Sequence, residues 1–137
     1  ATDGYVPLPG AYGMEEVDLA LRLHASGGRI LSTAWLRVFH DTDLQRHTDP
    51  VVTANSIANL ALLAYLRYPV RLWLIGLGQC LNRVFWLVRH GRWRGVWSGV
   101  VMIPDHLRAH QKYRMPLRRD CILSYRSLRR TSVPQRL

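Results

Sequence analysis

Residues 13–23 read GMEEVDLALRL, and this stretch predicts how the first part of the chain folds. Three carboxylates, Glu15, Glu16 and Asp18, fall within four positions, and an apolar pattern with helical spacing begins among them. Negative side chains are favoured at a helix start, because unpaired backbone N–H groups and the helix dipole attract them. We therefore predict a helix over residues 15–26 that ends at the glycine pair 27–28.

The same stretch contains candidates for catalysis. A carboxylate at a helix start, behind a Pro- and Gly-rich loop over residues 1–13, is one way in which a site obtains a general base. At about 3.6 residues per turn, Asp18 points about 200° away from Glu16. Asp18 and Arg22 also have the spacing of an ion pair on a helix surface. Glu15 and Glu16 are therefore the candidate bases, and Asp18 is predicted to be structural.

Residues 29–39, which follow the predicted helix, read as an extended segment. Trp35, Arg37 and Phe39 alternate with smaller apolar residues, as expected for a strand. His40 comes directly after the strand, in a polar loop. A histidine at this place, downstream of paired acids, is a candidate metal ligand or phosphate partner.

The remainder of the chain is predicted to be helical. Asp49 and Pro50 suit the cap and the first position of a helix that runs to residue 67, and further helices are predicted over residues 70–90, 92–112 and 117–130. The longest uncharged run covers residues 50–66 and contains four polar side chains. A membrane span needs roughly 20 mostly apolar residues, so this run falls short.

Charge is unevenly distributed along the 137 residues, whose net charge is +10. Residues 1–50 carry four arginines against seven acids, whereas residues 51–137 carry fifteen basic residues against two acids. Tryptophan and arginine interleaved through leucine-rich helices are typical of helices that lie at a membrane interface. We predict contact with an anionic membrane surface, and the alternative is a helical subdomain in water with tryptophans in its core. Nucleic-acid binding is not expected, because the basic residues are not gathered on one polar stripe.

Taken together, residues 12–23, 28–31 and 35–40 resemble the C-terminal half of the catalytic domain in family-2 glycosyltransferases of the GT-A fold. The parts that carry the resemblance are a turn before paired acids, a helix of the type VDLALR, the sequence GRIL and a strand that ends in histidine. The resemblance implies that Glu16 is the general base and that Glu15 supports it. It also implies acceptor binding at Tyr12 and Gly13, and contact of His40 with a divalent metal, Mg or Mn, or with the diphosphate. The family usually has aspartate at the position of Glu16, so either glutamate remains a candidate for the base.

The resemblance implies an α/β segment over residues 1–48, followed by a basic amphipathic helical region over residues 49–137 that associates with membranes. The expected activity is an inverting, non-processive transfer of a sugar from a nucleotide-sugar donor to a glycan or lipid-linked acceptor. Such a reaction belongs to bacterial cell-envelope polysaccharide synthesis, at the cytoplasmic face of the membrane. The family's nucleotide-binding half and its metal motif are not in these residues. We therefore expect a C-terminal segment that is inactive alone and whose metal is held mostly by upstream residues. The alternative function is a non-enzymatic, basic, membrane-associated helical module.

Overall fold

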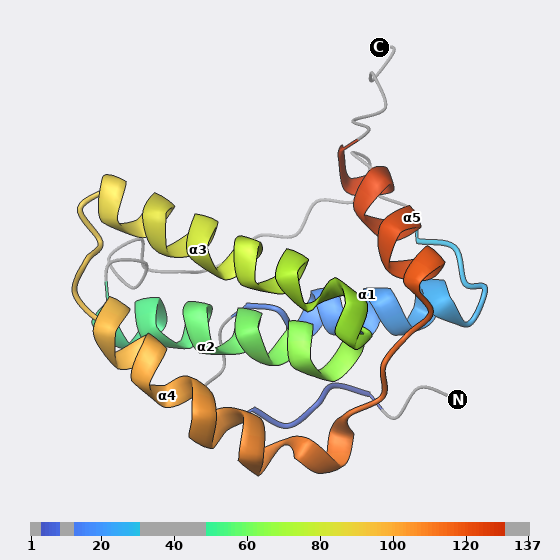
Figure 1. Ribbon diagram of the computed structural model, residues 1–137, viewed down its shortest axis with the longest axis horizontal. Coiled ribbons are helices and arrows are strands. Elements are labelled where there is room, and N and C mark those ends of the chain that lie inside the picture. The colour runs from blue at the N-terminus through green and yellow to red at the C-terminus, as the bar shows by residue number, and fades with distance from the viewer. Residues whose placement is uncertain (1–3, 9–12, 31–48, 131–137) are drawn as a thin grey trace, which may run out of the picture.

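The computed structural model describes residues 4–8, 13–30 and 49–130, and these residues form helices and their connections (Figure 1). Helix α2 lies at the centre, with α3 packed on one side of it and α4 on the other, while α1 and α5 pack together at one end. The elements, in chain order, are α1 (Glu15–Ala25), α2 (Pro50–Arg67), η2 (Val70–Leu72), α3 (Trp73–Arg89), α4 (Val96–Ala109), η3 (Gln111–Tyr113) and α5 (Arg119–Arg130).

The predicted α/β class is wrong. Of the residues that the structure describes, 74% are helical and none belongs to a strand. Most of the predicted strand falls on residues 31–48, which lie outside the described part. The apolar side of α1 packs against helices: Leu21 shares one core cluster with Leu63 of α2 and Ile122 of α5. Among the described residues, α1 therefore packs on two other helices rather than on a strand.

Most of the helix ends are where local sequence signals place them. Asp49 caps α2, since its side chain accepts a hydrogen bond of 2.8 Å from the N–H of Val51. The glycine pair ends α1, where Gly27 has a φ of 85° and Gly28 donates to the carbonyl of Leu23 at 2.9 Å. The helix predicted over residues 92–112 begins later, at Val96, because the chain first turns through a left-handed conformation.

Helix α2 is buried over most of its surface, which explains why residues 50–66 carry no charge. Thirteen of the 18 residues of α2 are buried, and they include the four polar residues of the uncharged run: Thr53, Asn55, Ser56 and Asn59. Protein neighbours thus exclude water from this helix. None of the helices within residues 4–8, 13–30 and 49–130 is long and apolar enough to cross a membrane.

Small residues allow the three central helices to approach closely. A Cβ atom on Gly99 of α4 would lie 2.8 Å from the carbonyl oxygen of Ala54 in α2. A Cβ atom on Gly76 of α3 would lie 2.6 Å from the Cβ of Ala64, also in α2. Larger side chains at either glycine would push the neighbouring helix away from α2.

Helices α1 and α5 are neighbours in space although they are far apart in sequence (Figure 1). Leu21 of α1 and Ile122 of α5 are both buried in the shared core. At the edge of this contact, Nε2 of His24 lies 3.3 Å from the hydroxyl of Ser124, 100 positions along the chain.

Candidate functional site

Asp18 is the centre of a buried ion network that fixes α1 on α2. The residue is 6% exposed, and its carboxylate accepts hydrogen bonds from Nε of Arg22, at 2.9 Å, and from Nη2 of Arg67, at 3.2 Å. Nε of Arg67 also donates to Oδ1 of Asp18. The pair of Asp18 with Arg22 forms as its spacing predicted, but it is buried rather than on the surface. Arg67, which lies 49 positions away, was not predicted as a partner.

The two arginines also hold backbone segments from other parts of the chain. Arg22 donates to the carbonyl of Gly4, and Nη1 of Arg67 donates to the carbonyl of Tyr113 at 3.2 Å. The network therefore joins α1, α2, the segment 4–8 and η3. It fixes the helix that carries the paired acids.

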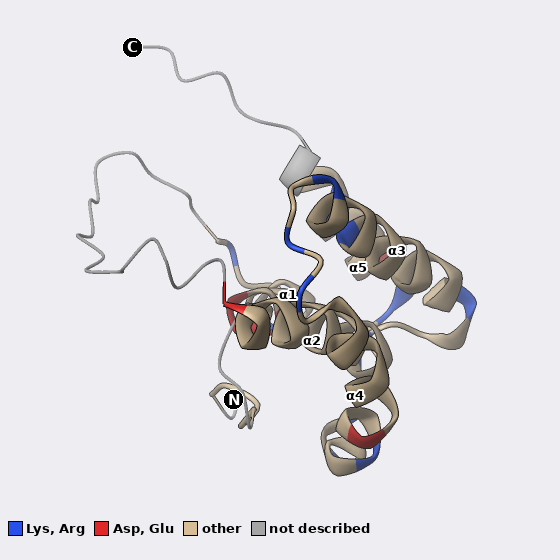
Figure 2. Ribbon diagram, turned by 90° about the vertical axis from the view of Figure 1, so that its left-hand side faces the viewer, with Lys and Arg blue, Asp and Glu red and all other residues tan. Residues whose placement is uncertain are grey.

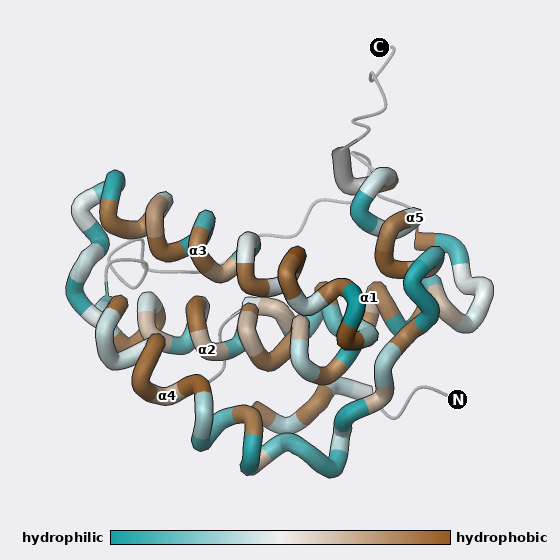
Figure 3. The backbone as a smooth tube through the Cα atoms, viewed as in Figure 1, coloured by the Kyte–Doolittle hydropathy of each residue, from teal (hydrophilic) through white to brown (hydrophobic). Residues whose placement is uncertain are grey.

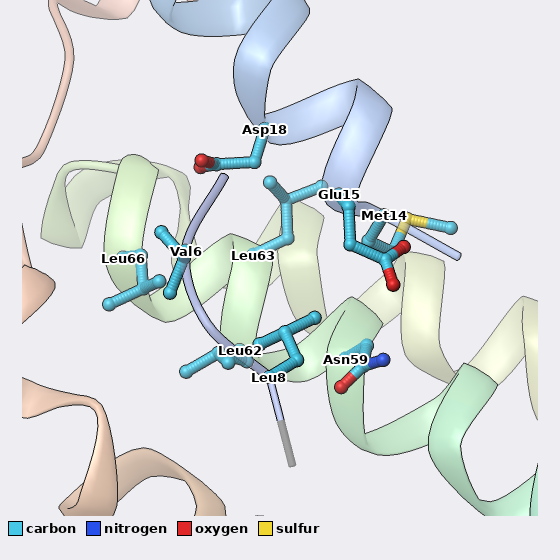
Figure 4. Close-up of a pocket in the computed structure, with 9 residues that line it drawn as sticks. All are labelled: Val6, Leu8, Met14, Glu15, Asp18, Asn59, Leu62, Leu63 and Leu66. Atoms are coloured by element: carbon cyan, nitrogen blue, oxygen red, sulfur yellow. The ribbon is translucent and has the colours of Figure 1, made fainter. Parts of the chain in front are cut away.

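Glu15 and Glu16 begin α1 and face different surroundings. Figure 4 shows Glu15 beside Met14 and Asn59, with its carboxylate pointing away from that of Asp18. Glu16 is exposed to solvent, and Glu15 is half-buried. In the part of the chain that the structure describes, no ion pair involves either glutamate. Figure 2 shows the acids gathered at this start of α1.

A small cavity lies next to Glu15, between α1, α2 and the segment 4–8. Its volume is about 20 Å³, which is room for about one water molecule. Apart from Glu15, Asp18 and Asn59, its walls are apolar side chains: Val6, Leu8, Met14, Leu62, Leu63 and Leu66 (Figure 4). The cavity is too small to hold a sugar.

The other predicted site residues divide into two groups. Gly13 is described: it has a φ of 74°, and its carbonyl lies 3.5 Å from the side-chain nitrogen of Asn59. Tyr12 and His40 lie outside the described residues. Within residues 4–8, 13–30 and 49–130, no group of three or more His, Cys, Asp or Glu side chains is arranged to hold a metal ion.

Buried polar side chains, which were not predicted from the sequence, connect the turn at Gly13 to α4. The carbonyl side-chain oxygen of Asn59 lies 2.8 Å from Nε2 of His106, and both residues are buried. His110, one helical turn later, places Nδ1 2.8 Å from the carbonyl of His106 and Nε2 3.0 Å from that of Pro7. The signal in the sequence was the spacing of two histidines by four, which places both on one face of a helix.

Stability should depend on pH through His106. Burial, and then the neighbouring His110, lower the pKa of His106 below its usual value. Because the unfolded chain then binds this proton more readily, the free energy of unfolding falls as the pH drops below about 6.5. Urea unfolding between about pH 5 and about pH 8 measures this fall. The His106→Gln variant should show a shallower fall, since His110 is present in both proteins, and identical pH profiles would contradict the assignment.

Helices α3 and α4 leave many large apolar side chains in contact with solvent. Figure 3 shows that hydrophobic residues recur along both helices. Leu74, near the start of α3, is 81% exposed, and Trp97, near the start of α4, is 77% exposed. The other exposed members, with those two, are called the α3–α4 apolar residues: Trp73, Leu77, Leu81, Phe85, Trp86, Val88, Trp93, Val100, Val101 and Met102.

No family model, no curated protein and no solved structure matches this chain.

Proposed function

We propose that the chain is a segment of a glycosyltransferase that moves a sugar from a nucleotide donor to an acceptor hydroxyl, with Glu16 as the general base. The proposal rests on the different surroundings of the acids at the start of α1. Asp18 is fully engaged by Arg22 and Arg67, whereas Glu16 is exposed and makes no ion pair among the described residues. A carboxylate that is not held by a cation is free to accept a proton.

In this proposal, Glu16 removes the proton of the acceptor hydroxyl while the hydroxyl oxygen attacks the anomeric carbon. The bond from that carbon to the nucleotide diphosphate breaks on the opposite face, and the configuration inverts. Glu15 stands one position earlier and is the alternative base. The ion network of Asp18 positions both glutamates, because it fixes the first turns of α1 against α2.

The experiment compares Glu16→Gln, Glu15→Gln and the control Asp105→Asn in the intact protein that contains this segment. The Glu16→Gln variant should lose about 10²–10⁴-fold in transfer rate while donor binding is unchanged, since only proton transfer is removed. The control removes a carboxylate from an exposed pair with Arg108 and should transfer at the normal rate. If Glu15→Gln alone is inactive, the base is Glu15. Full activity in both variants would reject the proposed function.

We also propose that the segment works while bound to the cytoplasmic face of a membrane. The α3–α4 apolar residues support this, because exposed tryptophan and leucine side chains partition into the interface of a bilayer. Charge supports it too: residues 50–104 contain six arginines and no acid, and all of these arginines except the buried Arg67 lie outside the Asp18 network. Arg83 and Arg94 lie over the rings of Trp86 and Trp93, which places cations beside apolar side chains. Anionic headgroups complement such a surface.

Membrane binding is measured by sedimentation of the chain with vesicles. Vesicles that contain phosphatidylglycerol should bind the chain in a salt-dependent manner, and pure phosphatidylcholine vesicles should bind it more weakly. The double variant Phe85→Ser/Trp97→Ser should bind at least about tenfold more weakly, because two large apolar side chains no longer enter the interface. The control Leu128→Ser changes an exposed leucine of α5 and should bind normally. Equal binding of all three proteins would exclude the α3–α4 apolar residues as the contact.

The alternative function is a non-enzymatic membrane-associated module, and the same two experiments separate it from the enzyme. An intact protein that binds anionic vesicles but transfers no sugar from any nucleotide donor would favour the module. Loss of transfer in the Glu16→Gln variant, with vesicle binding intact, would favour the enzyme.

A further inference from the structure

We propose that a basic cleft next to α1 binds an anion that carries a phosphate group. The cleft has a volume of about 490 Å³ and lies between the backbone of residues 4–7 and residues 112–115. Four cationic side chains from three separate places in the sequence line it: Arg22, Arg67, and the near neighbours Lys112 and Arg114. The proposal concerns neither Glu15 nor Glu16, so it stands or falls separately from the proposed function.

The charges around this cleft do not balance. Arg22 and Arg67 are buried, and they share the single carboxylate of Asp18. Asp18 lines the small cavity beside Glu15, whereas its two partners line the cleft, so the network forms the wall between the two spaces. None of the described residues that line the cleft is acidic. A buried positive charge without its own partner is unfavourable, and a bound anion removes that imbalance.

Contacts with neighbouring residues hold Arg114 in place at the wall of the cleft. Its Nη1 donates to the carbonyl of Tyr65, and its guanidinium carbon lies 4.8 Å from the ring centre of Tyr65 and 5.3 Å from that of Trp73. A guanidinium has five N–H donors, so the bond to Tyr65 leaves donors for a ligand. Lys112 extends over Tyr113, with 5.0 Å between its ammonium nitrogen and the ring centre. Side chains held in this way lose little freedom when a ligand binds.

The donors and the space together point to a phosphate ester. Planar guanidinium groups match the oxygens of phosphate in pairs, and an ammonium adds a point charge. The cleft is several times larger than one phosphate group, which leaves room for the organic part of the ester. Such an ester is either a soluble molecule or a lipid headgroup. A lipid is one of the two sources because Trp73, which contacts Arg114, is also the first of the exposed apolar residues of α3.

The first test titrates the 137-residue chain with inorganic phosphate and then with glycerol phosphate at low ionic strength, with chloride as the comparison anion, by calorimetry or NMR. The affinity for phosphate and for glycerol phosphate should fall by about tenfold or more in each of the variants Arg114→Gln and Lys112→Gln, because a charge-assisted hydrogen bond is lost. Arg108→Gln, which removes an exposed cation outside the cleft, should bind like the unchanged chain. Arg114→Lys should bind with intermediate affinity, since it keeps the charge but loses the fork.

A second arm identifies the source of the phosphate. If the ligand is a lipid, vesicles of phosphatidylcholine with phosphatidic acid should lose affinity for Arg114→Gln but not for Arg108→Gln, and soluble phosphate should bind weakly. If the ligand is a soluble ester, glycerol phosphate should bind and both variants should bind vesicles equally. Asp3 precedes Gly4 in the sequence, so every titration is repeated with Asp3→Asn. Failure of phosphate and of phosphatidic acid to distinguish Arg114→Gln from Arg108→Gln, in both backgrounds, would overturn the proposal.

Discussion

Replacing Asp18 with asparagine should lower the free energy of unfolding by about 3–5 kcal/mol, which is the usual effect of removing one partner from a buried ion pair. Asparagine keeps the shape of the side chain but not its charge. Arg22 and Arg67 would then be buried without a counter-charge, because Asp18 is the carboxylate that both contact. Urea or guanidinium unfolding followed by circular dichroism measures the change.

Two further variants test the origin of this effect. Asp105→Asn breaks an ion pair in which both side chains are more than 80% exposed, and it should change stability by less than about 1 kcal/mol. The combined change Asp18→Leu, Arg22→Met and Arg67→Met removes the whole network at once. It should be less destabilising than Asp18→Asn, since no unpaired charge is left behind. Equal effects of Asp18→Asn and Asp105→Asn would show that the Asp18 network is not buried in solution.

Replacing Gly95 with alanine should destabilise the chain by about 2–4 kcal/mol through two separate causes. The backbone of Gly95 has a φ of 88°, a left-handed conformation that residues with a Cβ atom adopt at a cost. The new Cβ would also lie 2.1 Å from the carbonyl oxygen of Pro50, so α4 must move away from the start of α2.

Gly91 provides the matched control for this prediction. Its φ is 70°, but a Cβ atom there would meet nothing within 4 Å. Gly91→Ala should therefore show only the conformational cost, about 1 kcal/mol. Thermal or urea unfolding of the two variants separates the collision from the strain. If the free energy of unfolding of Gly95→Ala is no lower than that of Gly91→Ala, α4 does not approach α2 as closely as described.

Local sequence signals predicted the helices well because the signals and the structure they specify lie within a few residues. Asp49 with Pro50 begins α2, and the pair 27–28 ends α1, as capping chemistry requires. The class of fold was predicted wrongly because an apolar face on α1 does not reveal what will cover it. The resemblance suggested a sheet, whereas Leu63 and Ile122 of two other helices cover it in the structure.

The candidate site was only partly predictable for a related reason. The acids of α1 are adjacent in sequence, and their spacing predicted that Asp18 is structural while Glu15 and Glu16 are not. Arg67, by contrast, reaches Asp18 across 49 positions, and nothing near Arg67 in the sequence indicates that it is buried. Asn59 is similar: the sequence showed that its uncharged run is too short to span a membrane, but it left open whether the helices lie on a membrane surface or pack together in water. Long-range packing determines that Asn59 is buried.

The contact between α1 and α5 has a consequence for how the chain is made. Synthesis proceeds from the N-terminus at about 5–20 residues per second, so α1 waits about 5–20 seconds for the partner that lies 100 positions later. In the later part of that interval, once α2 has been made, Leu63 is available to cover Leu21, but Ile122 is not. The apolar side of the helix that carries the paired acids therefore stays partly uncovered until α5 emerges, although Asp18 can already pair with Arg67 once α2 has been made.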